Sequence, residues 1–119
     1  MNREQFAKGI AEMAEKCPFN GNVSATFKFH SGNVCSCNVV SDEVSSTNNE
    51  EKVIKVFTPT IVEMLMYKLD RKKVYYGELK AIVSVRNGEY DFAEFLVSEK
   101  VSLGQAKALV KTEHNRRAA

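Results

Sequence analysis

The pair Asn87-Gly88 stands between two runs, residues 79–86 and 89–97, in which apolar and polar side chains alternate. Asn-Gly is the preferred sequence of a two-residue type I′ turn, because both central residues need a positive φ. Alternation with a period of two is typical of a strand with one buried face. The stretch therefore predicts a β-hairpin, whose short turn fixes the register and pairs Arg86 with Glu89, Val85 with Tyr90 and Val83 with Phe92.

This register gives the hairpin one apolar face that needs a cover, made by Leu79, Ala81, Val83, Val85, Tyr90 and Phe92. It also predicts a cross-strand ion pair between Arg86 and Glu89. A second interpretation stays open, because Asp91 and Glu94 have the spacing of a helix N-cap and residues 92–98 could form a short helix instead.

A first hairpin is expected over residues 23–40, where apolar side chains again alternate with polar ones. A three-residue loop at 31–33 sets apolar side chains against each other, whereas a two-residue loop places Phe27 against Ser36. We therefore expect the longer loop, with Phe29 opposite Cys35, Phe27 opposite Cys37 and Ala25 opposite Val39.

Three helices are predicted, over residues 2–17, 60–70 and 103–113. Each has an apolar stripe at helical spacing. Asn2 is the expected cap of the first helix, and Thr60 with Glu63 has capping-box spacing at the start of the second. Ser102 and Gln105 have the same spacing before the third. Residues 41–51 have the composition of a loop, and residues 53–57 read as a short strand.

These elements predict an α+β fold with a mainly antiparallel sheet of four to five strands, built from two hairpins, and about three helices packed on one face. The other face is expected to meet water through Thr26, Lys28, Ser84, Arg86 and Asp91. We expect one domain over residues 1–114 and a mobile basic tail over residues 115–119.

The bulk composition narrows the class of protein. A chain of 119 residues with 44% hydrophobic and 27% charged residues is typical of one globular domain. The net charge of +2 is too small to argue by itself for a nucleic-acid partner. No targeting signal or membrane span is seen in the sequence, and the three cysteines are most simply reduced thiols, so a cytoplasmic protein is expected.

The pair Cys35 and Cys37 is the first candidate for chemistry, with Cys17 and His30 as further zinc ligands. Structural zinc sites usually separate paired cysteines by two to four residues, and no second pair exists, so packing in the core is the preferred interpretation. We expect no metal and no cofactor. No catalytic motif is found, which favours a protein that is not an enzyme; a dispersed site around His30 and the thiols is the weaker alternative.

A small cytoplasmic, non-catalytic binding protein of regulatory, inhibitor or accessory type is therefore the leading hypothesis. Tyr75, Tyr76 and Arg86 are its candidate contacts with a partner protein, because Tyr and Arg are enriched at interface hot spots. The alternative is a nucleic-acid-binding protein, in which basic side chains contact phosphates and the two tyrosines stack on bases. Its candidate residues are Lys68, Arg71, Lys72, Lys73, Lys107, Lys111, Arg116 and Arg117.

One short segment, Glu94 to Val110, with Ser-Leu-Gly-Gln-Ala-Lys-Ala-Leu at its centre, resembles the segment that follows the helix-turn-helix of ParB-type partition proteins. The resemblance implies DNA binding. It covers only this segment, and the Asn87-Gly88 hairpin occupies the place where the recognition helix of that family would be expected.

Overall fold

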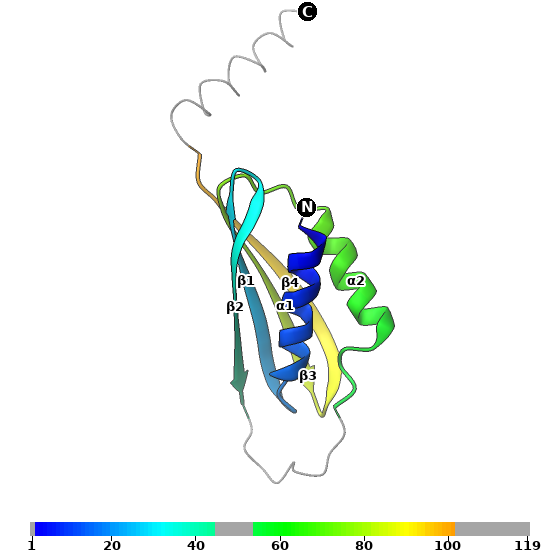
Figure 1. Cartoon of the computed structure of the whole chain (residues 1–119). Coiled ribbons are helices and arrows are strands. Elements are labelled where there is room, and N and C mark those ends of the chain that lie inside the picture. The colour runs from blue at the N-terminus through cyan, green and yellow to red at the C-terminus, as the bar shows by residue number, and fades with distance from the viewer. Residues whose placement is uncertain (1, 45–53, 102–119) are drawn as a thin grey trace, which may run out of the picture.

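The computed structural model describes residues 2–44 and 54–101, which form a four-stranded antiparallel sheet with two helices on one of its faces (Figure 1). The elements follow one another as α1 (Arg3–Glu15), β1 (Gly21–His30), β2 (Asn33–Glu43), α2 (Pro59–Asp70), β3 (Gly77–Arg86) and β4 (Glu89–Glu99). The strand order is β2-β1-β3-β4, so the two hairpins meet along the central β1–β3 pair.

The predicted α+β class, with a four-stranded antiparallel sheet, is confirmed. Two of the three predicted helices lie in the described part of the chain, while the helix expected over 103–113 and the tail over 115–119 fall outside it. Residues 53–57 were expected to form a short strand, but of the described residues 54–57 only Lys55 pairs, in an isolated parallel bridge with Glu89.

Helix α1 packs tightly on the sheet because Gly9 faces it. A Cβ at Gly9 would lie 2.6 Å from the ring of Phe27, closer than side chains approach one another. Phe6, Ile10 and Met13 complete the buried stripe predicted for this helix. The small residue in the stripe thus sets how near the helix axis comes to β1.

Helix α2 begins earlier than the sequence suggested. The hydroxyl of Thr58, and not that of Thr60, accepts a hydrogen bond from the backbone N–H of Ile61 at 3.3 Å. Pro59 follows as the first helical residue, a position where its missing N–H costs nothing. The predicted cap at Thr60 is therefore wrong by two residues.

The second hairpin confirms the predicted two-residue turn and corrects the register beyond it. Arg86 pairs with Glu89 and Val85 with Tyr90, as expected. Asp91 is then left over as a β-bulge, so that Ser84 faces Phe92 and Val83 faces Ala93. The predicted Val83–Phe92 pair is wrong, because one extra residue on a strand moves every later side chain to the opposite face.

Residues 89–99 form one continuous strand, so the alternative of a helix over 92–98 is wrong. The first six residues of the segment that resembles ParB-type proteins, 94–99, belong to this strand.

The first hairpin also combines a two-residue turn with a β-bulge on its second strand. Its turn is the two-residue Ser31-Gly32, with φ values of 51° and 80°. His30 pairs with Asn33 and Phe29 with Val34, and a bulge at Cys35 then restores the expected pairs Phe27–Cys37 and Ala25–Val39. The three-residue loop and the Phe29–Cys35 pair were wrong, although they predicted the far register correctly.

The two halves of the chain repeat one αββ unit. Each strand of the second unit begins and ends 56 residues after its counterpart in the first. Gly21 corresponds to Gly77, Asn33 to Glu89, and the bulge at Cys35 to the bulge at Asp91. The central pair Ala25–Ala81 joins equivalent residues, so a pseudo-twofold axis passes through it. Between residues 2–44 and 58–100 only five pairs are identical, namely Lys16/Lys72, Gly21/Gly77, Ala25/Ala81, Gly32/Gly88 and Glu43/Glu99.

Equivalent hydrogen bonds tie each hairpin turn to the other unit. The N–H of Gly32 donates to Tyr75 O at 2.9 Å, and the N–H of Gly88 donates to Phe19 O at 2.8 Å. The shared core lies between the helices and the sheet, with its largest fully buried side chains from both units: Phe6, Met13, Val23, Phe27, Val56, Leu65, Leu69, Leu79 and Val83. The units therefore fold as one body.

Candidate functional site

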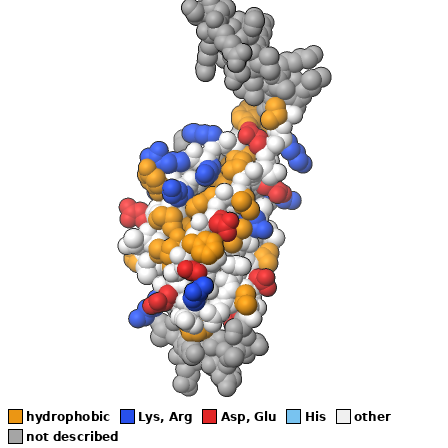
Figure 2. Space-filling model, turned by 180° about the vertical axis from the view of Figure 1, so that it is seen from behind, with side chains coloured by type: hydrophobic (Ala, Val, Ile, Leu, Met, Phe, Trp, Pro, Cys, Tyr) orange, Lys and Arg blue, Asp and Glu red, His pale blue; other side chains and the backbone are white. Residues whose placement is uncertain are grey.

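The sheet face turned away from the helices, here called the open face, is not covered by any element of residues 2–44 or 54–101 (Figure 2). Thr26, Lys28, Ser84 and Arg86 belong to it by their strand positions, as predicted. The expectation of a mainly polar face is nevertheless incomplete. Figure 2 shows hydrophobic side chains running along this face between charged ones.

Three apolar side chains form what we call the open-face patch: Ile82 on β3, with Phe92 and Leu96 on β4. Ile82 pairs with Glu94, so Phe92 and Leu96 lie diagonally on either side of it. Phe92 is 47% exposed and Leu96 51% exposed. A contiguous apolar patch on a monomer is typical of a binding surface, whereas single exposed apolar residues are ordinary.

The Asp91 bulge is the reason that the open-face patch is not visible in the sequence pattern. Without the bulge, Phe92 belongs to the buried face of the hairpin; with it, Phe92 and Leu96 point outward and Ala93 and Phe95 point toward the helices. The sequence offers no signal for this change of face, since Tyr90, Phe92, Glu94 and Leu96 follow one another at intervals of two and only the bulge places Tyr90 on the opposite face.

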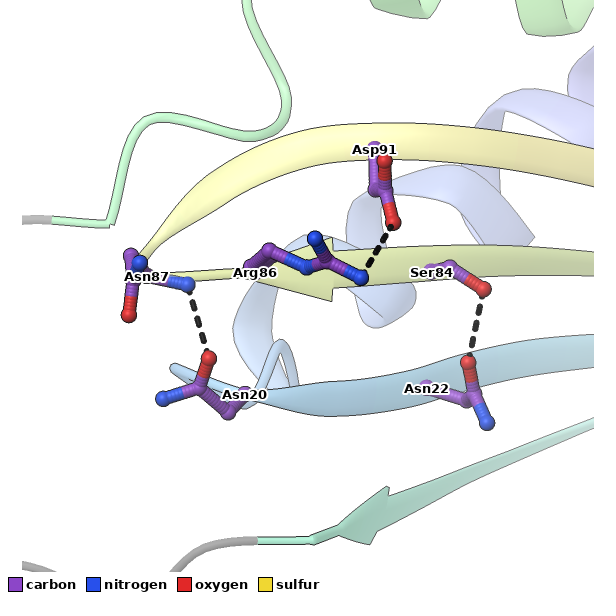
Figure 3. Close-up of polar contacts among 6 residues, drawn as sticks. All are labelled: Asn20, Asn22, Ser84, Arg86, Asn87 and Asp91. Carbon is purple, nitrogen blue, oxygen red and sulfur yellow. Dashed lines mark hydrogen bonds and ion pairs between the residues drawn. The ribbon is translucent and has the colours of Figure 1, made fainter.

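Polar side chains define the end of the open face near the β3–β4 turn (Figure 3). The Ser84 hydroxyl donates to Asn22 Oδ1 at 2.8 Å, and the backbone N–H of Asn87 donates to Asn20 Oδ1 at 2.8 Å. Arg86 Nη2 lies 3.9 Å from Asp91 Oδ2. The predicted ionic partner Glu89 is thus wrong, because the bulge brings Asp91 beside the guanidinium instead.

Tyr75 and Tyr76 lie at the other end of β3, beside the β1–β2 turn. Their rings contact each other edge to face at 5.0 Å, and Tyr76 meets His30 in the same way at 5.1 Å. The Tyr76 hydroxyl is 3.0 Å from Ser31 Oγ. Since Arg86 ends the same strand roughly 30 Å away, the three predicted contacts do not form one site.

The predicted basic residues are divided between two surfaces. Arg71 lies over the ring of Tyr67, with its guanidinium carbon 4.1 Å from the ring centre. Lys72 and Lys73 line a groove at the start of α1. Lys68 lies in the last turn of α2. The other four predicted residues, Lys107, Lys111, Arg116 and Arg117, fall outside the described residues.

The groove, here called the α1 groove, has a volume of about 660 Å³. Its floor is apolar, because Phe6, Phe29 and Val74 are buried beneath it. Its rim comes from the start of α1, the β1–β2 turn, the end of α2 and the end of β4: Asn2, Arg3, Gly32, Asn33, Asp70, Lys72, Lys73, Tyr75 and Glu99. Arg3 and Asp70 form an ion pair across it at 2.6 Å.

The thiols do not assemble a site. Cys35 and Cys37 are exposed, so their predicted packing in the core is wrong, and Cys17 is half-buried. Burial raises the pKa of the Cys17 thiol to about 11. Although the Cys37 residue is exposed, its sulfur lies beside Gly9 of α1, and this partial desolvation raises its pKa, with a smaller contribution from the Glu12 carboxylate. Within residues 2–44 and 54–101, no group of three or more His, Cys, Asp or Glu side chains could hold a metal ion.

Comparison with protein-family models, characterised proteins and solved structures finds no match to this chain. In the described ranges, the helices are too short and too polar to span a bilayer.

Proposed function

We propose that this protein is a non-catalytic binding protein that contacts another protein through the open face. The observation that carries the proposal is the half-exposed pair Phe92 and Leu96 around Ile82. Aromatic and aliphatic side chains of this kind, ringed by charges, anchor protein interfaces once they are desolvated. Lys80 and Glu94 stand among them on the same face and would give the contact its orientation.

The charges on the open face are mixed in sign, in keeping with the small net charge of the chain. Lys28, Lys80 and Arg86 are interspersed with Glu78 and Glu94 along the central and outer strands. A face with mixed charge offers no continuous basic footprint for a polyphosphate backbone. It suits a protein surface with complementary pairs.

The test is a double substitution of the patch, Phe92→Ser with Leu96→Ser, against a matched control on the same strand. Val97→Ser serves as the control, since Val97 is 46% exposed but lies on the helix side of β4. A partner that co-purifies in a fixed ratio should bind the double variant at least about thirtyfold more weakly. Equal retention by the double variant and the control would refute the proposal.

A second candidate, nucleic-acid binding, is supported by one arrangement: Lys72, Lys73 and Tyr75 border the same groove. Cations beside an exposed aromatic ring suit a single-stranded nucleic acid. Affinity for random oligonucleotides should then fall steeply with salt and drop further in Lys72→Glu with Lys73→Glu. The charge-matched control is Lys8→Glu on α1 with Lys16→Glu directly after it. Equal loss in both double variants, or no binding at low salt, would exclude nucleic-acid binding.

A further inference from the structure

The two αββ units differ at the entrance to their helices. Before α2, residues 55–57 lie against the β3–β4 turn, where the N–H of Lys55 donates to Gly88 O at 2.6 Å. Val56 is fully buried in the core, and Phe57 packs against it. The second unit therefore fills the space beside its own turn with an extended piece of the chain.

The equivalent space in the first unit is the α1 groove. Asn2 and Gly32 both border this groove. They correspond to Thr58 and Gly88 of the second unit. A smaller pocket of about 400 Å³ remains around Lys55 and Phe57 at the matching place in the second unit. The α1 groove is thus the counterpart of the site that Val56 occupies.

The Asn2 side chain stands in for the missing peptide group. Its Nδ2 donates to Gly32 O at 2.9 Å, the counterpart of the bond from Lys55 N–H to Gly88 O. Its Oδ1 accepts from the N–H of Val34 at 3.0 Å. The amide therefore satisfies the turn, but no side chain among the described residues takes the place of Val56 over Phe6 and Phe29.

We propose that the α1 groove binds an extended segment of a partner polypeptide, which places a Val or Ile side chain on Phe6, Phe29 and Val74. The peptide group before that side chain replaces the Asn2 amide at the β1–β2 turn. Such strand-like docking supplies backbone hydrogen bonds for affinity and one pocket for specificity. This site is separate from the open face, and its failure would leave the proposal for that face untouched.

The charges on the rim of the groove determine which residue is favoured next to the Val or Ile of the bound segment. Arg3 and Asp70 neutralise each other, which leaves Lys72 and Lys73 against Glu99. An acidic residue is therefore favoured where the second unit has Lys55. The chain's own segment 54–58, with Lys55 replaced by Asp, gives the probe Ile-Asp-Val-Phe-Thr.

The first experiment grafts the segment in front of Asn2 in the full chain, so that Ile-Lys-Val-Phe precedes Asn2 as residues 54–57 precede Thr58. Covalent linkage gives the segment a high effective concentration at the groove. The grafted chain should unfold at a higher urea concentration than a graft with Asp in place of its Val. Identical midpoints for the two grafts would overturn the proposal.

The second experiment titrates the free probe into the ¹⁵N-labelled full chain. Saturable shifts are expected at the amides of Gly32, Val34 and Val74, with none at Gly88, and the peptide Ile-Asp-Asp-Phe-Thr should produce none. Asn2→Ala should bind the probe about threefold more tightly, because the displaced amide no longer competes for the turn. Shifts that do not depend on the Val, or shifts caused by an oligothymidylate and not by the peptide, would contradict the proposal.

Discussion

The first and second αββ units share a backbone and differ in what they present to a partner. Each has the same strand bounds, turn and bulge, 56 residues apart, as Gly32 and Gly88 illustrate. On the open face, however, Phe92 and Leu96 of the second unit correspond to Ser36 and Val40 of the first. At the helix entrance, the second unit is filled and the first is open. Both candidate binding surfaces are departures from the pseudo-twofold symmetry.

The difference shows that two units with the same backbone can carry different exposed side chains without a change of fold. Backbone requirements are kept in both units, at the positive-φ glycines and at the axis residues Ala25 and Ala81. Side chains that only meet solvent or a partner are free to diverge. A surface present in one unit and absent from the other is therefore a stronger candidate for function than one shared by both.

The largest effect is expected from Leu65, the counterpart of Gly9 on the buried face of α2. Leu65 is fully buried, whereas Gly9 lets α1 approach Phe27. Leu65→Ala should lower the free energy of unfolding by about 3 kcal/mol, because the surrounding core relaxes only partly into the cavity that is left. Urea denaturation measures the loss. Leu65→Met is the control and should cost less than about 1.5 kcal/mol; equal losses would show that α2 packs loosely.

A smaller and symmetric effect is expected at Gly21 and Gly77. They have φ values of 143° and 145°, and a Cβ at either would collide with a backbone carbonyl oxygen, of Asp42 or of Ser98. Gly21→Ala and Gly77→Ala should each cost about 2–3 kcal/mol of stability. Thermal or urea unfolding of both variants tests the equivalence of the units. A loss of stability in only one of the two variants would show that the backbones of the two units are not equivalent at these glycines.

A slight effect is expected from the ion pair that exists only in the second unit. Arg86 and Asp91 correspond to His30 and Cys35, and the Arg86 side chain is 77% exposed. Arg86→Ala should change stability by less than about 0.5 kcal/mol, since exposed pairs are screened by solvent. A loss above about 1 kcal/mol in urea denaturation would mean that the pair holds the bulge in place.

The smallest effect on the fold is expected from Cys17, whose counterpart is Lys73. Burial raises its pKa from 9.0 to about 11, so the folded state favours the neutral thiol. Its contribution to stability is complete below pH 9 and is lost as the pH rises through about 11. Alkylation of Cys17 by iodoacetamide should be slow at pH 8 and still be accelerating at pH 10. A rate that levels off near pH 9 would contradict the raised pKa.

The sequence predicted the fold class, both described helices and the turn at Asn87-Gly88, because periodicity and turn chemistry are local properties. It could not place the bulges, since nothing local tells which residue of β2 or β4 is left unpaired. The N-cap of α2 at Thr58 could have been predicted from Pro59, because proline favours the first helical position.

The repeat had one visible signal. Gly21 and Gly32 are spaced like Gly77 and Gly88, and each spacing encloses one strand and its turn. Only five equivalent pairs are identical, so the other equivalent residues can be recognised only from the strand pairing in the structure. The open-face patch depends on the Asp91 bulge and the α1 groove on the repeat, so neither surface was predicted. Tyr75, Lys72 and Lys73 were named as candidate contacts, but the groove that they share was not foreseen.

The central claim, that the open face of the second unit contacts a partner protein, is tested most directly by site-specific photo-crosslinking from two adjacent residues. Leu96 and Val97 are about equally exposed, at 51% and 46%, but lie on opposite faces of β4. A photo-crosslinker at position 96 should capture one protein in the source cells, and a crosslinker at position 97 should not. Capture from position 97 alone, or equal capture from both positions, would contradict the claim.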